Sequence, residues 1–283
     1  MTPKLVIVRG GGDLATGTAW MLHRAGFPVL ILESAYPSAI RRSVSFCEAV
    51  YEKTQTVEGV TACLAQDAAE ALSLLADGQV ALLVDPEAAC VPSFQEENAA
   101  FRPVALVDAI IAKKNLGTRI DMAPFVIALG PGFTAGVDCH AVVETMRGHN
   151  LGRVYFEGSA LPNTGIPGLI AGHDRDRVIH APAAGTFHAT ASIGDMVKQG
   201  DVIGRVDDTP VTASIDGLLR GILRDGFPVR KGCKTADIDP RPEEHDNCFT
   251  ISDKARTIGG SVLCAVMHAV RGMAPRQPDL PGD

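Results

Sequence analysis

The chain has 283 residues and a formal net charge of −7, with 46% apolar and 21% charged residues. This length predicts about two domains, and the acidic balance without a dense Lys/Arg run argues against a nucleic-acid partner. No apolar run approaches the about 20 residues that cross a bilayer, and seven scattered cysteines without a Cys-x-x-Cys pair argue against a disulfide framework. We therefore expect a cytoplasmic protein that binds neither nucleic acid nor membrane.

The first half alternates short apolar runs with helical segments, which predicts an α/β domain with a parallel sheet covered on both faces. We expect this Rossmann-like domain to occupy residues 1–176. The expected strands are Leu5–Val8, Val29–Leu32, Val57–Leu64, Val80–Val84, Phe125–Leu129 and Arg153–Glu157. The expected helices are Leu14–Ala25, Asp67–Asp77, Val104–Lys114 and Asp138–Gly148.

A glycine loop follows the first strand and opens the first helix. Such a loop can bring the backbone close to a pyrophosphate and direct the amides of a helix N-terminus at it. Glu33 ends the second strand, where an acid can accept hydrogen bonds from ribose hydroxyls. The candidate ligand-binding residues of this region are Gly10, Gly11, Gly12, Asp13, Gly17 and Glu33.

Two features argue against a simple dehydrogenase. Asp13 lies near the expected phosphate charge, although its alternative role is an N-cap of the helix. No recognisable hydride-transfer constellation follows downstream. The loop could therefore bind a nucleotide or a nucleotide-like pterin cofactor without redox chemistry.

A second glycine loop contains Gly130 and Gly132 and follows another expected strand. Loops at the carboxyl ends of parallel strands lie on the same edge of the sheet, so both loops are expected to face one anionic ligand. Cys139 and His140 would then lie in the first turn of the helix Asp138–Gly148, where a thiol pKa is lowered. They are candidate catalytic residues, and the alternative is a buried cysteine beside an exposed histidine.

The second half contains an internal repeat with an offset of 32 residues, in which Gly185 matches Gly217 and Gly200 matches Gly232. Two similar sets of short strands predict a small all-β barrel over residues 177–241. The repeat resembles the barrel-sandwich hybrid of biotinyl and lipoyl domains. The hairpin between its halves, Asp207–Pro210, has no lysine for attachment, so a fixed structural or docking domain is expected.

The end of the repeat carries two acids, Asp237 and Asp239, which face the same side of a strand. They could bind a hard cation or orient Arg241, and the alternative is an Asp-Pro turn with a paired arginine. Residues 242–272 are expected to form a C-terminal helical segment, and residues 273–283 a flexible tail.

Several segments together resemble the YqeB-like family, among them "RGGGDLATGTAW", "IRRSVSFCEAVYEKTQTVEG", "GPGFTAGVDCHAVVETMRGHNLGRV", "ALPNTGIPG" and "ISDKARTIGG". The resemblance covers roughly Lys4 to Val270. That family is linked to maturation of selenium-dependent molybdenum hydroxylases, and the first domain is also similar to XdhC/CoxI-type proteins. The resemblance implies an accessory protein that handles a molybdopterin-type cofactor or its selenium or sulfur ligand. Its implied partners are a molybdenum hydroxylase apo-enzyme and a small anionic cofactor.

The same resemblance assigns possible roles to further residues. Arg41 and Arg42 become candidate phosphate or pterin contacts, and the alternative is a solvated loop. Cys139 becomes a candidate carrier of sulfur or of transiently bound selenium. Asn163 and Thr164 lie in a polar turn that could contact the cofactor or simply link two domains.

Two other functions stay open. An NAD(P)-dependent oxidoreductase fits Gly10 and Glu33 but lacks hydride-transfer machinery. A non-catalytic nucleotide-binding or docking module fits the barrel repeat. A homo-oligomer is compatible with each of these functions.

Overall fold

The computed structural model describes residues 4–95, 101–166 and 168–272, and the chain forms two compact units. Unit 1 comprises Met1–Pro37, Phe46–Asn163 and Ser252–Asp283, and unit 2 comprises Ser38–Ser45 and Thr164–Ile251. These boundaries differ from the expected division at residue 176. The segment Ser38–Ser45 belongs to unit 2, and the helix that begins after Ser252 belongs to unit 1. The expected tail, residues 273–283, lies outside the described residues.

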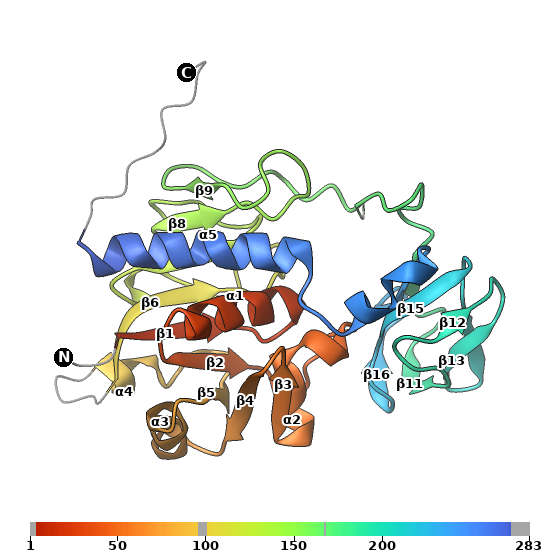
Figure 1. Ribbon diagram of the computed structural model, residues 1–283, viewed down its shortest axis with the longest axis horizontal. Coiled ribbons are helices and arrows are strands. Elements are labelled where there is room, and N and C mark those ends of the chain that lie inside the picture. Colours follow the sequence, from red (N-terminus) through yellow and green to blue (C-terminus); the bar gives the residue numbers. More distant parts are fainter. Residues whose placement is uncertain (1–3, 96–100, 167, 273–283) are drawn as a thin grey trace. The chain divides into compact units, whose positions relative to one another are not determined.

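Unit 1 contains a nine-stranded sheet with the order β3-β4-β5-β2-β1-β6-β7-β8-β9 (Figure 1). Its strands are β1 (Lys4–Arg9), β2 (Val29–Glu33), β3 (Thr54–Val57), β4 (Val60–Ala65), β5 (Val80–Val84), β6 (Arg102–Asp108), β7 (Val126–Leu129), β8 (Ala141–Val143) and β9 (Val154–Tyr155). The strands from β4 to β8 in this order are parallel, whereas β3 and β9 are antiparallel to their neighbours at the two edges. The sheet is therefore mixed.

The central strands are long apolar runs because both faces of the sheet are covered. Leu5 to Val8 and Val29 to Leu32 are almost completely buried. The helices of unit 1 are α1 (Asp13–Arg24), α2 (Ala49–Glu52), α3 (Ala68–Ala76), α4 (Val91–Gln95) and α5 (Asp253–Val270), with 3₁₀ turns at η2 (Phe46–Glu48) and η3 (Ile120–Met122).

Helices α1 and α5 lie side by side at very short distance (Figure 1). A Cβ atom on Gly17 would lie 2.7 Å from the Cβ of Ala255, and one on Gly259 would lie 2.7 Å from the carbonyl oxygen of Gly17. Both glycines are therefore required by packing. Gly17 also contacts the start of α5 while Gly259 reaches Met21, so the two helices run in the same direction. Their N-termini lie at the same edge of the sheet.

Two expected helices of unit 1 are wrong. Most of Val104–Lys114 is the buried central strand β6 and the loop after it, and Asp138–Gly148 contains the short strand β8. Both segments hold runs of valine, isoleucine and alanine, and a short apolar run fits a buried strand as well as a helix. The expected strand Val57–Leu64 is instead a hairpin of β3 and β4. Its turn residues Glu58 and Gly59 both have positive φ, which suits a tight hairpin turn.

Unit 2 contains two four-stranded antiparallel sheets, with the orders β10-β17-β15-β12 and β14-β13-β11-β16. The strands are β10 (Val178–His180), β11 (Gly185–Ala189), β12 (Met196–Val197), β13 (Val202–Val206), β14 (Thr209–Thr212), β15 (Gly217–Ile222), β16 (Phe227–Val229) and β17 (Lys234–Asp239). Short 3₁₀ helices occur at η1 (Arg42–Val44) and η4 (Pro242–Cys248). One apolar cluster, which includes Phe187, Ile203 and Leu219, draws on strands of both sheets.

The internal repeat is visible in the backbone of unit 2. Gly185 and Gly217 begin β11 and β15 with φ values of 153° and 154°. Both conformations favour glycine, and at Gly217 the backbone also excludes a side chain, since a Cβ there would lie 2.3 Å from the carbonyl oxygen of Asp239. The repeated glycines thus mark equivalent strand starts.

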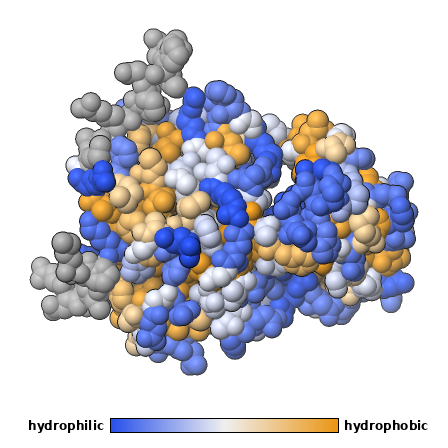
Figure 2. Space-filling model, viewed as in Figure 1, coloured by the Kyte–Doolittle hydropathy of each residue, from blue (hydrophilic) through white to orange (hydrophobic). Residues whose placement is uncertain are grey.

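The expected combination of a Rossmann-like parallel domain and a biotinyl- or lipoyl-like barrel-sandwich hybrid is wrong. Unit 1 has a mixed sheet with antiparallel strands at both edges, and unit 2 has two separate antiparallel sheets. Within the described residues, no helix has the length and apolar character that crossing a membrane would need. Figure 2 shows hydrophilic and hydrophobic residues interspersed on the face that it presents.

Candidate functional site

The carboxyl edge of the unit 1 sheet brings several polar and glycine-rich loops together. Strand β1 leads into Gly10, β6 ends at Asp108, β7 leads into Gly130 and β8 leads into Glu144. Because these strands are parallel, all four loops lie on one edge, as expected for the two glycine loops. The parallel helices α1 and α5 begin at the same edge.

The first glycine loop packs tightly against the backbone of Ala109 and Cys47. Gly10 has a φ of 95°, and a Cβ there would lie 3.0 Å from the carbonyl oxygen of Ala109. A Cβ on Gly11 would lie 2.9 Å from the backbone nitrogen of Cys47, whose N–H donates to the Gly11 carbonyl at 2.8 Å. The Thr16 hydroxyl donates to the same carbonyl at 3.1 Å. Packing and conformation within unit 1 therefore account for these two glycines.

Gly12 is different, because neither its conformation nor its packing against the described residues requires a glycine. Its φ is −66°, which any residue adopts, and a Cβ at this position would meet no atom within 4 Å. Gly12 is the N-cap of α1, and no side chain caps the helix. Asp13 is the first helical residue, so its alternative role as the N-cap is wrong. The first-turn amides of α1 thus border open space beside Gly12.

Glu33 positions the loop from the neighbouring strand. Its carboxylate accepts hydrogen bonds from the backbone N–H groups of Gly11 and Ser34, both at 2.7 Å. A carboxylate has about four acceptor sites, so these two bonds leave capacity for ligand hydroxyls. Gly17, the remaining candidate of this region, serves the contact between α1 and α5 described above.

The glycines of the second loop are explained by packing within unit 1. A Cβ on Gly130 would lie 2.5 Å from Oγ1 of Thr145, and one on Gly132 would lie 2.6 Å from Cα of Lys114. Both residues also have positive φ. The second loop therefore shares the edge with the first loop, but its glycines do not indicate a ligand.

A buried charged network between β1 and β6 supports this edge, and sequence reasoning did not find it. Arg9 is 2% exposed and Asp108 is 1% exposed, with 3.7 Å between Nη1 and Oδ2. The hydroxyl of Thr118 donates to Asp108 at 2.5 Å and accepts from Arg9. Burial raises the pKa of Asp108, in spite of the opposing hydrogen bonds and the Arg9 charge. The sequence signal was an arginine that directly precedes Gly10 at the end of an apolar strand.

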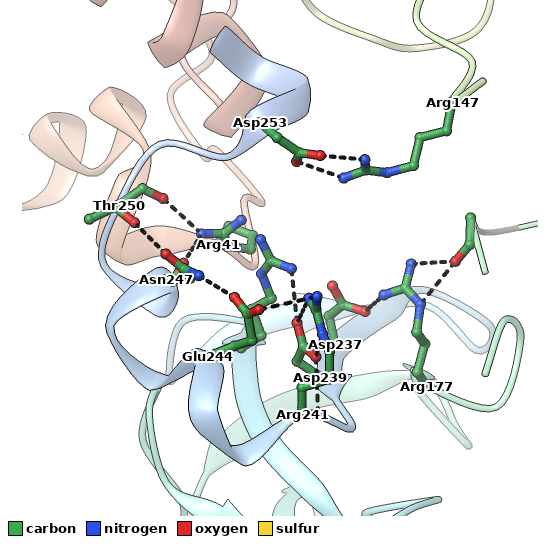
Figure 3. A network of polar contacts seen from close by, with 12 residues as sticks. Arg41, Arg147, Arg177, Asp237, Asp239, Arg241, Glu244, Asn247, Thr250 and Asp253 are labelled. Atoms are coloured by element: carbon green, nitrogen blue, oxygen red, sulfur yellow. Dashed lines mark hydrogen bonds and ion pairs between the residues drawn. The ribbon is translucent and has the colours of Figure 1, made fainter. Parts of the chain in front are cut away.

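Lys254 is a second residue that the sequence analysis missed. It lies in the first turn of α5, where a cation opposes the helix dipole. Burial and the charge of Arg147 lower the pKa of Lys254, while Asp13, Glu144 and Asp253 act in the opposite direction. Arg147 forms a two-pronged ion pair with Asp253 at 2.8 and 3.0 Å (Figure 3). Among the described residues, Lys254 has no hydrogen-bond or ion-pair partner, which leaves its amine available beside α1.

Cys139 and His140 lie at the opposite edge of the sheet from the glycine loops. The expected helix is absent, and His140 precedes β8, with its Nδ1 accepting from the N–H of Val126 at 2.9 Å. Cys139 is completely buried, and burial with the nearby Asp138 charge raises its thiol pKa to about 12. The expectation of a lowered thiol pKa is therefore wrong. Burial also lowers the pKa of His140.

Arg41 and Arg42 belong to unit 2, whereas the glycine loops belong to unit 1. Arg41 is 7% exposed and donates to the carbonyl oxygens of Asn247 at 3.1 Å and Thr250 at 3.3 Å (Figure 3). Arg42 donates to the carbonyl oxygen of Ile222 at 2.9 Å. These bonds hold the 38–45 segment within unit 2.

Asp237 and Asp239 bind arginines (Figure 3). Asp237 pairs with Arg177 at 2.5 Å. Asp239 accepts from Arg241 at 2.8 and 2.9 Å and from Arg220 at 3.1 Å. Within the described ranges, no three His, Cys, Asp or Glu side chains come together as a possible metal site. The arrangement therefore contradicts the cation site and matches the alternative in which Asp239 orients Arg241.

Asn163 and Thr164 lie in an exposed stretch where unit 1 passes into unit 2. The Thr164 hydroxyl accepts from the N–H of Ile166 at 3.2 Å. Their position is that of a link between the two units.

Fold and edge geometry together define an α/β protein whose glycine loop and two helix N-termini meet at the carboxyl edge of a mixed sheet. The chain is 53% identical over 265 residues to a protein named "Uncharacterized protein YqeB" from Escherichia coli K12. This similarity covers 93% of the chain and 47% of that protein, so the chain spans about half the length of the relative. Over nearly all of its own length, the chain is therefore similar in sequence to this YqeB protein. No family model matches the sequence.

Three solved structures are only remotely similar. A succinylglutamate desuccinylase/aspartoacylase from Rhodobacter sphaeroides is 14% identical, with a TM-score of 0.26 and coverage of 85% of this chain and 86% of that one. An aspartoacylase family protein from Mesorhizobium loti is 13% identical, with a TM-score of 0.25 and coverage of 84% and 85%. The ectoine utilization protein EutE (DoeB) from Ruegeria pomeroyi is 13% identical, with a TM-score of 0.22 and coverage of 82% and 56%.

None of these three names refers to molybdenum-hydroxylase maturation, a Rossmann domain or a barrel-sandwich hybrid. Likenesses at such low TM-scores carry no argument about that classification. At TM-scores of 0.22 to 0.26, they carry no argument for desuccinylase or aspartoacylase chemistry either.

Proposed function

We propose that unit 1 binds an anionic ligand with a phosphate or diphosphate group at the carboxyl edge of its sheet. Gly12 carries this proposal. Its two glycine neighbours are required by packing, whereas Gly12 has ordinary backbone angles and open space where a side chain would be. Packing therefore gives no reason for glycine at this position, and a ligand that approaches the backbone would supply one.

The charges around Gly12 support an anion. The uncapped first turn of α1 directs its N–H groups outward, and the helix dipole adds a partial positive charge. Lys254 supplies a full charge from the neighbouring α5 and offsets Asp13. The carboxylate of Glu33, which is positioned by the N–H of Gly11, can accept hydrogen bonds from hydroxyl groups of a sugar or pterin. A nucleotide and a pterin phosphate share these features.

The test compares ligand affinity in two glycine variants. Gly12→Ala should weaken the binding of pyrophosphate, ADP and NADH by at least about tenfold, or about 1.4 kcal/mol, because the new methyl group occupies the approach path. The variant should lose up to about 1 kcal/mol of stability, because alanine is a poorer N-cap than glycine, but it should fold, since no atom obstructs the methyl group. Isothermal titration calorimetry at constant ionic strength measures the dissociation constant of each ligand for the wild type and for the variant.

Gly260→Ala is the matched control, because a Cβ there also meets no atom within 4 Å. It lies inside α5, so we expect slightly higher stability and unchanged affinity. Lys254→Met provides a second variant, which should weaken pyrophosphate binding while raising stability at pH 7, because it removes a charge that burial disfavours. Wild-type protein that binds none of the probes, or equal affinity in Gly12→Ala, would refute the proposal.

The accessory role in the maturation of selenium-dependent molybdenum hydroxylases is a separate prediction, which rests on the sequence resemblance alone. We expect a client hydroxylase that is produced without this protein to contain less molybdenum or selenium and to have lower activity. Elemental analysis of the purified hydroxylase measures both contents. Unchanged metal, selenium and activity would contradict this role without affecting the ligand-binding proposal.

A further inference from the structure

A cavity of about 500 Å³ lies in unit 1 between the 149–156 segment and the C-terminal half of α5. Ala255, near the start of α5, packs against α1 at the carboxyl edge, and the cavity begins nine residues further along the helix, at Cys264. This spacing separates the cavity from Gly12. The residues that line it are His149, Asn150, Leu151, Gly152, Arg153, Val154, Phe156, Cys264, Ala265 and His268.

The polar side chains of the cavity are not used by the fold. Among the described residues, the side chains of His149, Asn150, Arg153 and His268 have no hydrogen-bond or ion-pair partner. Nδ1 of His268 is buried without a partner. Such a buried polar atom costs about 1–3 kcal/mol, so its presence beside a cavity needs an explanation, and a bound molecule provides one.

The wall opposite α5 is fixed before any ligand arrives. Gly152 has a φ of 80°, and a Cβ there would lie 2.7 Å from Oγ of Ser261 and 2.8 Å from Cγ2 of Thr257. Its N–H donates to the carbonyl oxygen of Glu144 at 2.9 Å, and the N–H of Arg153 donates to that of Asn150 at 2.9 Å. The segment that carries Arg153 is therefore a tight turn pressed against the helix.

The chemistry of the lining selects one kind of ligand. Among the described residues, the lining contains an arginine and two histidines but no acidic residue, and its apolar part consists of Leu151, Val154, Phe156 and Ala265. The rings of Phe156 and His268 lie 6.1 Å apart. Small-molecule sites typically combine an apolar wall with a few polar groups that fix orientation. We propose that this cavity binds a small organic carboxylate, with its head held by Arg153 and His268 and its apolar body against Phe156.

Cys264 is exposed at the cavity and provides a local reporter. Its thiolate displaces iodide from iodoacetate or iodoacetamide, so that an S–C bond forms as the C–I bond breaks. The two reagents differ in charge, and the ratio of their rate constants therefore measures anion enrichment independently of thiol ionisation. Peptide mass spectrometry gives this ratio for Cys264 and, in the same molecule, for the half-buried Cys63 on β4.

We expect the iodoacetate-to-iodoacetamide ratio at Cys264 to exceed that at Cys63 by about tenfold, the low end of the enrichment in a cationic cleft. Arg153→Gln and His268→Gln should each reduce this excess at least threefold. Arg119→Gln, which removes an exposed arginine paired with Asp121 elsewhere on unit 1, should leave it unchanged. Benzoate should slow both reagents at Cys264 in the wild type but not in Arg153→Gln.

Equal ratios at the two cysteines, or no protection by benzoate, would overturn the proposal. An excess that persists in both Arg153→Gln and His268→Gln would also overturn it. Circular dichroism establishes whether each variant is folded. If one of the two variants is unfolded, the other one still tests the proposal. None of these outcomes depends on ligand binding at Gly12.

Discussion

Replacing Asp108 with alanine is expected to lower the local free energy of unfolding of unit 1 by about 3–5 kcal/mol, the cost of breaking a buried ion pair. The variant leaves Arg9 at 2% exposure without its carboxylate, and Thr118 loses its acceptor. The Arg9 guanidinium also donates to the carbonyl oxygen of Pro86 at 2.7 Å, so the loss reaches the loop after β5. Native-state hydrogen exchange of the amides in β1 and β6 measures this effect.

Asp121→Ala is the matched control in unit 1. Asp121 pairs with Arg119, but both side chains are about two-thirds exposed. Exposed pairs of this kind contribute less than about 1 kcal/mol. If Asp108→Ala lowered the free energy of unfolding by less than about 1 kcal/mol, as in the control, the buried Arg9–Asp108 pair would not stabilise unit 1 as predicted.

Asp239→Ala is expected to destabilise unit 2 by about 3 kcal/mol, because one carboxylate at 2% exposure holds two arginines. Arg220 from β15 and Arg241 from the turn after β17 both pair with this carboxylate. Exchange of the amides in β15 and β17 reports on this unit alone. Asp216→Ala is the control, since Asp216 forms an exposed pair with Lys198 and its removal should have little effect.

The contributions of Asp239 and Asp108 to stability are expected to depend on pH in opposite directions. Burial alone would raise the pKa of Asp239, but the hydrogen bonds from Arg241 and the charge of Arg220 outweigh it and lower the pKa below 3.8. The unfolded chain then binds the proton first, so the stabilisation by Asp239 is present above pH 3.8 and is lost as the pH falls below that value. Asp108 has a raised pKa, so its contribution falls as the pH rises above 3.8.

The protection factors of the amides in β15 and β17, which correct for the pH dependence of intrinsic exchange, should therefore fall between about pH 4 and pH 2 in the wild type and change less in Asp239→Ala. The variant has no group at this position that can take up a proton. Identical pH profiles of wild type and variant in these strands would contradict the assigned role of Asp239.

Sequence patterns correctly predicted the strands and helices whose conformation is determined by residues nearby in the sequence. The strands at Leu5–Val8, Val29–Leu32 and Val80–Val84 and the helix after Gly12 are present, because apolar runs bounded by turn residues left little choice. Two expected helices, Val104–Lys114 and Asp138–Gly148, became strands because burial between other strands decided their conformation. Such burial depends on residues distant in sequence, which periodicity does not contain.

The candidate site divides in the same way. The common edge of the glycine loops followed from local motifs and the rule for parallel strands. The hypothesis for Cys139 depended on a helix that is absent, and with the helix the reason for a low thiol pKa also disappears. Lys254 reaches the edge from the last helix, 244 residues after Gly10, and no local pattern indicates that proximity.

The contact of Gly17 with Ala255 and Gly259 has a consequence for synthesis on the ribosome. The buried face of α1 stays uncovered until α5 has been translated, more than two hundred residues later. Residues 164–251 leave the exit tunnel earlier, so the nascent chain can complete most of the smaller unit while the larger one still lacks a layer. Until α5 has been translated, the face of α1 that it covers is an exposed surface of the kind that promotes aggregation.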